Sequence, residues 1–148
     1  MKEPEQGMTL IVKVITRLTV GFILLFGIYI VLHGHLSPGG GFAGGVIVAL
    51  SFIHLILAYG GKFAFKKLDQ IKASFLENIG AIMFLTIALL GIIGGFFFLN
   101  FLNKGEPFHL ASAGIIPFCN IAICLKVGAG LFLIFIALTL FKIGEKKR

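Results

Sequence analysis

The chain has 148 residues and a net charge of +7, with 58% hydrophobic and only 13% charged residues. Soluble domains carry about 25% charged and 45–50% apolar residues, so this chain has too little polar surface to cover a water-facing core. The same composition excludes intrinsic disorder. A mean hydropathy of +1.06 indicates an integral membrane protein.

Four apolar runs predict four transmembrane helices, at about 9–33, 41–60, 76–101 and 119–142. A helix needs about 20 residues to cross a hydrocarbon core about 30 Å thick. The runs do not alternate between apolar and polar residues, which excludes a β-barrel. No cleavable signal peptide is visible, so the first segment is expected to stay as a helix. We expect an all-α fold, with a single membrane domain over 1–148 and no soluble domain.

Basic residues gather in every second connection, which predicts the orientation. Eleven of them lie in the two terminal segments and the connection between the second and third runs: Lys2, Lys13, Arg17, Lys62, Lys66, Lys67, Lys72, Lys142, Lys146, Lys147 and Arg148. The other two connections hold only Lys104. By the positive-inside rule, both termini are expected in the cytoplasm of a multi-pass protein of the cell membrane. The same placement explains the basic excess without nucleic-acid binding.

Cofactor and metal chemistry finds little support. Cys119 and Cys124 have the spacing of neither a zinc site nor a redox pair, and we expect them to be small packing residues. The glycine-rich run from Ser37 to Gly45 lacks the Lys-Ser/Thr of a phosphate-binding loop. We therefore expect no metal, no cofactor and no catalysis by this chain.

The glycine-rich run instead suggests close helix packing. Gly40 with Gly44, and Gly41 with Gly45, are small residues four apart, and Pro38 precedes them. In lipid such pairs let helix backbones approach closely. Continuing from Gly40 at helical spacing leads through Ser51 to His54. This face is either a packing seam or a hydrated, proton-conducting seam in which His54 titrates.

Three further titratable residues lie near the ends of the runs. His33 and His35 follow the first run, where they either fix a turn or exchange protons at a pore mouth. Glu77 precedes the apolar core of the third run. It either marks the cytoplasmic interface and pairs with Lys72 or Lys67, or it contacts a proton or cation.

Lys126 is the one charged residue in the apolar part of the fourth run, about 121–141. It lies 16 residues before Lys142, about 24 Å of helix, which leaves it about 6 Å inside a 30 Å core. A lysine stem can nearly reach water from there. The alternative is a functional intramembrane residue, because a lysine removed from water releases its proton more easily.

No carboxylate lies deep in any run, although a self-sufficient cation antiporter would need one. The chain therefore resembles one subunit of a larger membrane assembly.

Two segments carry a family resemblance. The segment from Leu32 to Gly45, with His33, His35, Pro38 and its glycines, resembles the first signature of the MnhB/MrpB family. The segment from Gly114 to Leu131, which includes Lys126, resembles the second. The resemblance extends over about 15–140. It implies a four-helix subunit of a multisubunit Na⁺/H⁺ antiporter, either of the stand-alone Mrp type or within an archaeal membrane-bound hydrogenase or sulfur-reducing complex.

The leading hypothesis is thus a non-catalytic subunit that supports assembly and cation/proton translocation alongside other antiporter subunits. The alternatives are a stand-alone, homo-oligomeric small transporter or channel, and a purely structural membrane scaffold. The expected ion or proton path residues are Lys126, His54, His33, His35 and Glu77.

Overall fold

The computed structural model describes residues 7–60, 70–102, 105–106, 108–109 and 112–145. Within them the chain forms four helices: α1 (Leu10–Leu32), α2 (Gly41–Tyr59), α4 (Gln70–Ile93) and α5 (Ile116–Glu145). All four are long and apolar enough to cross a membrane, and the described residues contain no strand. The prediction of an all-α, four-span membrane protein is confirmed. Many of the basic residues used to orient it, Lys66 and Lys104 among them, lie outside the described part.

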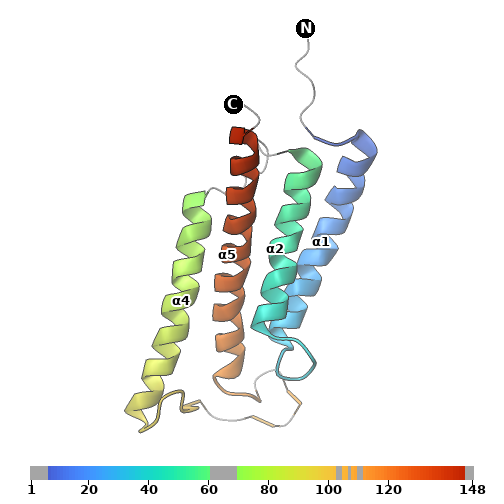
Figure 1. Cartoon of the computed structure of the whole chain (residues 1–148). Coiled ribbons are helices and arrows are strands. Elements are labelled where there is room, and N and C mark those ends of the chain that lie inside the picture. Colours follow the sequence, from blue (N-terminus) through green and yellow to red (C-terminus); the bar gives the residue numbers. More distant parts are fainter. Residues whose placement is uncertain (1–6, 61–69, 103–104, 107, 110–111, 146–148) are drawn as a thin grey trace.

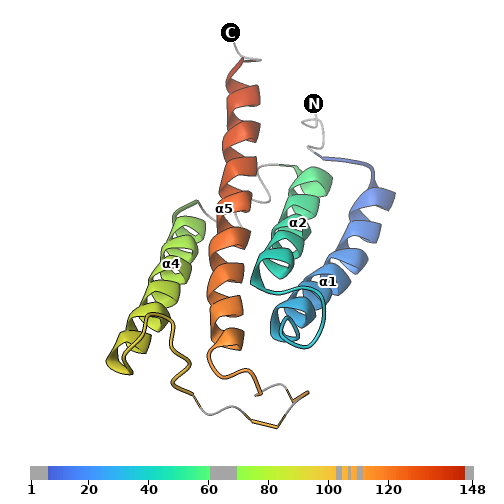
Figure 2. The same cartoon turned by 60° about the horizontal axis from the view of Figure 1, so that its bottom comes forward.

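The helices stand side by side in a row, in the order α4, α5, α2, α1 (Figure 1). α2 packs against both α1 and α5, and α5 packs against α4 on its other side, whereas α1 and α5 touch only lightly. Figure 2 keeps α1 and α4 at opposite ends of the row after a turn of 60°. The start of α1 and the end of α5 lie at the same end of the molecule, as four crossings require.

Glycine makes the close contacts on both sides of α2. A Cβ on Gly44 would collide with Val31 of α1 and would stand 2.9 Å from the Gly27 carbonyl oxygen. A Cβ on Gly45 would stand 3.0 Å from the Cys124 carbonyl oxygen of α5. The adjacent residues Gly44 and Gly45 therefore allow close packing on two sides of α2, against α1 and against α5, and both partners belong to this chain.

A small apolar core joins α2, α4 and α5. Ile56, Ala73, Phe132 and Ile136 are buried together, and Phe52 meets Phe132 edge to face with ring centroids 6.1 Å apart. Most other large apolar side chains are exposed, for example Phe22 on α1 at 75% and Ile93 on α4 at 84%. Burial of this small core leaves the wide surfaces of the row to lipid or to other subunits.

The third helix departs most from its predicted span of 76–101. α4 begins at Gln70, because the helix continues through a more polar stretch before the apolar run. It ends at Ile93, where Gly94 and Gly95 follow and Gly95 takes a φ of 108°. Glycine reaches this left-handed region without strain, so helices commonly end there. The chain then turns back, and the Phe98 N–H donates to the Ala88 carbonyl oxygen at 3.3 Å.

Candidate functional site: an intramembrane ion pair

Lys126 and Glu77 form an ion pair between neighbouring helices. The Lys126 Nζ on α5 donates to Glu77 Oε1 on α4 at 3.2 Å. Glycine makes room for the pair: a Cβ on Gly80 would stand 2.7 Å from the Lys126 backbone nitrogen, and one on Gly130 would stand 3.7 Å from Glu77 Oε1. The absence of a Cβ on Gly80 allows α4 and α5 to lie close enough for a direct hydrogen bond, whereas a Cβ on Gly130 would make only an ordinary van der Waals contact.

Both charged residues lie within helices that are long and apolar enough to cross a membrane. Lys126 stands ten residues from Ile116, the start of its span, which is about 15 Å of helix. Glu77 stands seven residues from Gln70, or about 10 Å. The pair remains open to one side, since the Lys126 side chain is 51% exposed and that of Glu77 is 31% exposed. It is therefore a polar patch on the surface of the row, within two of the apolar helices.

His54 lies on another seam, apart from this pair. Its Nε2 shares a hydrogen bond of 3.2 Å with Oγ1 of Thr16, a buried residue of α1. Ser51, one turn earlier, is also buried, and its hydroxyl donates to the Val48 carbonyl oxygen at 2.7 Å. The face predicted from Gly40 to His54 thus contacts α1 over part of its length, and its polar groups are hydrogen-bonded.

His33 and His35 lie in the connection between α1 and α2. His33 stacks on Tyr29 and donates from Nδ1 to its carbonyl oxygen at 3.1 Å. His35 Nε2 donates to the His109 carbonyl oxygen at 3.3 Å and so joins this connection to the one before α5. Among the described residues, no group of three or more His, Cys, Asp or Glu side chains has the geometry to hold a metal ion.

The residues predicted to pack at the α1–α2 connection differ in burial, since Gly40 and Gly41 are buried and Pro38 is exposed. Gly40 immediately precedes α2 and has a φ of 123°. Gly41 lies so close to the Asn120 backbone that a Cβ would collide with the Asn120 carbonyl oxygen. The Gly41 N–H donates to the side-chain Oδ1 of Asn120 at 3.3 Å.

Sequence reasoning missed Asn120 as a site residue, and it missed that Glu77 pairs with Lys126. Two cues were present. Asn120 is an amide within an apolar segment, and Glu77 and Lys126 are opposite charges, each isolated in its run. Neither cue reveals which helices are neighbours, so the pairs could not be assigned.

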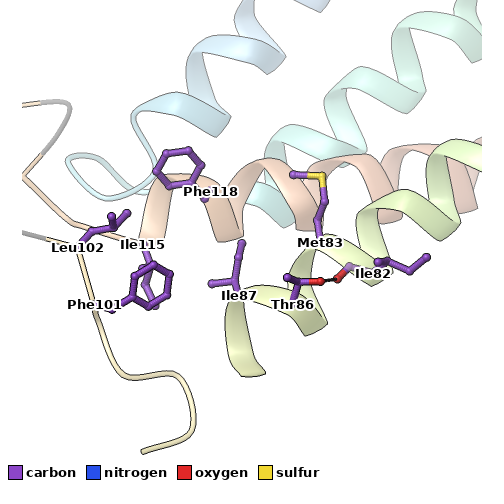
Figure 3. A pocket seen from close by; sticks show the side chains of 8 residues that line it. All are labelled: Ile82, Met83, Thr86, Ile87, Phe101, Leu102, Ile115 and Phe118. Carbon is purple, nitrogen blue, oxygen red and sulfur yellow. Dashed lines mark hydrogen bonds between the residues drawn. The ribbon is translucent and has the colours of Figure 1, made fainter. Parts of the chain in front are cut away.

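An apolar cavity of about 370 Å³ lies between α4, the start of α5 and the chain before it (Figure 3). Met83 and Ile87 face it from α4, and Phe101, Ile115 and Phe118 face it from the other side. Thr86 also lines it, but its hydroxyl donates to the Ile82 carbonyl oxygen at 2.7 Å. The lining of the cavity is almost wholly apolar, and the cavity shares no residue with the Lys126–Glu77 pair.

The fold and the ion pair together define a class, a multi-pass membrane protein with a charged pair between two of its apolar helices. Residues 11–133 match the family model of a domain related to the MnhB subunit of Na⁺/H⁺ antiporters. The chain therefore belongs to the MnhB family.

Relatives and a solved structure agree with this. The chain is 32% identical to an Na⁺/H⁺ antiporter subunit of Bacillus subtilis, over 93% of this chain and 94% of that one. It is 34% identical to a putative antiporter subunit of Staphylococcus haemolyticus over 73% of this chain and 71% of that one. A chain of the membrane-bound sulfane sulfur reductase, an archaeal respiratory membrane complex, has a similar fold, with a TM-score of 0.71 and 29% identity over 91% of this chain.

Some relatives are longer. An uncharacterized protein of Methanocaldococcus jannaschii is 39% identical over 74% of this chain, which spans 44% of that protein. The chain likewise spans 62% of the matched chain of the sulfane sulfur reductase.

Proposed function

We propose that this chain is a non-catalytic membrane subunit of a multisubunit Na⁺/H⁺ antiporter module, and that its Lys126–Glu77 pair takes part in the path of protons or cations. Membership of the MnhB family supports the first part. The ion pair carries the second. The module stands alone or belongs to a respiratory membrane complex, and the fold of the sulfane sulfur reductase chain supports the latter setting.

The pair is costly unless something besides lipid contacts it. A charged side chain at the centre of a transmembrane helix costs about 2.5–3.5 kcal/mol. Mutual pairing offsets part of this cost, yet half of the Lys126 side chain remains exposed, and only one of its three N–H donors bonds Glu77. A polar group of a partner subunit, or water held between the subunits, would meet the remaining donors. This requirement favours a location at a subunit interface.

The chemistry of the pair also suits ion exchange. When the Lys126 ammonium passes a proton to Glu77, both side chains become neutral and the ion pair is lost. When a cation approaches the carboxylate, it competes with Lys126 for the same oxygen. Each event changes the other, so the pair can couple a proton to a cation without any further titratable group in this chain.

The decisive experiment measures Na⁺-dependent proton movement in inverted vesicles that contain the assembled complex. We expect Lys126→Ala and Lys126→Arg both to assemble and both to lose most of the exchange. Arginine keeps the positive charge but does not release its proton at working pH. We expect Glu77→Gln to lose exchange as well. Wild-type exchange by Lys126→Arg would limit Lys126 to a fixed charge.

Thr86→Val is the matched control. Thr86 is also an exposed polar residue of α4, but its hydroxyl bonds its own helix. We expect this variant to assemble and exchange ions like the wild type. Equal losses of ion exchange in Thr86→Val and Glu77→Gln would mean that any change on α4 disturbs the complex. That result would contradict a specific role of the Lys126–Glu77 pair.

A further inference from the structure

Three exposed polar side chains follow one another along the first half of α4. Gln70, Ser74 and Asn78 are spaced four residues apart, so they form one polar stripe on the helix surface. Ile71 and Phe75 flank the stripe and are 76% and 66% exposed. Together these five residues line a shallow hollow of about 450 Å³. This side of α4 therefore has room for the side chains of a neighbour.

The polar stripe lies beside the apolar length of α5 and not beyond its end. Ala73 is buried in one cluster with Phe132 of α5. Phe132 stands eight residues before Leu140, where the apolar span of α5 ends, and this is about 12 Å of helix. Asn78 is five residues past Ala73, about 7 Å further from that end. The start of α4 likewise falls short of the neighbouring end of α5 in Figure 1.

No described helix of this chain covers the polar stripe. α4 stands at the end of the row and packs closely against α5 alone among the described helices. The Asn78 side chain is exposed, and it is not hydrogen-bonded to any other residue that the structure describes. Its amide carries two N–H donors and an acceptor oxygen, and hydrocarbon can bond none of them. An amide at this height therefore requires a hydrogen-bonding neighbour from outside the chain.

We propose that a transmembrane helix of another subunit packs along the polar stripe and places an uncharged hydrogen-bonding side chain opposite Asn78. Helices associate in lipid through small residues, which let backbones approach, and through amides and hydroxyls that bond across the interface. Ser74 supplies the first feature and Asn78 the second. The flanking residues favour a helix over a water-filled path, because water would leave Ile71 and Phe75 exposed to it.

The polar stripe is continuous with the Lys126–Glu77 pair. Ser74 lies three residues before Glu77, so their side chains are neighbours on the helix surface. The opposite charges of the pair already meet each other, which is why an uncharged partner group suits the adjacent amide. This contact rests on the proposed multisubunit module, but it does not depend on whether the pair takes part in ion movement.

The first test places a photo-reactive amino acid at position 78 of the chain in the assembled, purified complex. We expect a cross-link to a peptide from a membrane-spanning helix of a different subunit, identified by mass spectrometry. Position 22 is the control for non-specific capture, because Phe22 is 75% exposed on α1 at the other end of the row. Adducts with lipid alone at position 78, or a cross-link to a second copy of this chain, would overturn the proposal.

A water-filled path would give a different result. In a chain with Cys119 and Cys124 replaced, fast reaction of Asn78→Cys with a small water-soluble thiol reagent in the assembled complex would overturn the helix contact. Either negative result leaves the proposed function standing, provided that the chain still migrates with antiporter subunits. A chain that migrates without them contradicts the proposed function itself.

The second test uses the opposite preferences of lipid and of a hydrogen-bonded interface. Leucine is favourable in hydrocarbon, so Asn78→Leu would leave the complex at least as firm if the polar stripe faced lipid. With a partner helix bonded to the amide, we expect the chain to dissociate about 3- to 20-fold more readily as detergent is raised. Thr86→Val, on the same helix, should dissociate like the wild type, because the Thr86 hydroxyl bonds its own helix. Undiminished association of Asn78→Leu would contradict the proposal.

Discussion

Gly44 and Gly21 differ sharply in what an added side chain would meet. A Cβ on Gly44 would collide with Val31 of the adjacent α1, whereas one on Gly21 has nothing within 4 Å. From the sequence, the face that contains Gly44 was expected to pack against protein. The sequence did not indicate whether that protein is this chain or another subunit. In the structure the neighbour is α1 of the same chain, so a large residue at position 44 would disturb this chain before it disturbs the assembly.

We therefore predict that Gly44→Leu prevents correct folding of the chain. Overpacking costs about 1–3 kcal/mol, and one or two kcal/mol changes the folded ratio about 5–30-fold. The measure is the yield of monodisperse complex after mild extraction, compared with Gly21→Leu. We expect the yield of complex to fall several-fold for Gly44→Leu. For Gly21→Leu we expect no loss of yield through misfolding. Equal yields would contradict the α1–α2 seam.

The two members of the ion pair should be coupled in stability. Removing one partner leaves the other charge unpaired in the membrane, which costs more than removing both. We predict that Lys126→Ala and Glu77→Ala each lower the thermal midpoint of the complex, and that the double variant recovers part of the loss. The expected coupling is about 0.5–3 kcal/mol. Strictly additive effects would show that the two side chains do not interact in the assembled complex.

The sequence predicts single-residue chemistry better than it predicts pairs. Lys126 and Glu77 were both recognised as candidates because charges are rare in apolar runs. Their pairing depends on α4 lying beside α5, and helical periodicity along one segment carries no information about its neighbour. The bond between His54 and Thr16 was missed for the same reason.

At the level of elements, the end of α4 shows how glycine can stop a helix inside an apolar run. Hydropathy continues through Phe96, Phe97 and Phe98, so the run alone predicted a longer span. The structure ends the helix at Ile93 and returns the chain toward Gly91, where a Cβ would stand 2.8 Å from the Phe98 nitrogen. Hydropathy measures preference for lipid and not backbone conformation, which explains the difference in this span.

We predict that Gly95→Ala loosens this return. At a φ of 108° an L-residue is strained, and nothing lies within 4 Å of the added Cβ, so strain alone acts. Left-handed conformations cost roughly 1–2 kcal/mol. Hydrogen exchange at the Phe98 and Leu99 amides should become about 5–30-fold faster. Gly21→Ala, within a helix, should leave that exchange unchanged, and unchanged exchange in Gly95→Ala would mean that the turn does not depend on glycine.

At the level of the whole molecule, the orientation in the membrane remains a prediction from charge. We expect both termini and the connection around Lys66 in the cytoplasm, with Lys104 outside. In a variant with Cys119 and Cys124 replaced, an impermeant thiol reagent added to whole cells should label Lys104→Cys and not Lys66→Cys. The opposite pattern would invert the topology.

The half-exposed Lys126–Glu77 pair predicts that the chain does not work alone. After mild solubilisation, blue-native electrophoresis should show it migrating with other membrane subunits, and mass spectrometry should identify large antiporter subunits among them. A pure homo-oligomer would instead support the small-transporter alternative. A hydrogenase or sulfur-reducing subunit in the same band would distinguish a respiratory complex from a stand-alone antiporter.

The row of helices has a geometric consequence for transport. A single row of helices encloses no central pore. Each described helix has at most two close neighbours, and none is surrounded by the others. An ion that passes Lys126 must therefore move along one surface of the helix row. Another polypeptide would have to form the other wall of its path. Cation selectivity would then depend on both polypeptides. Replacing the corresponding subunit of a related complex by this chain, with all other subunits of that complex unchanged, should change which cation the complex carries.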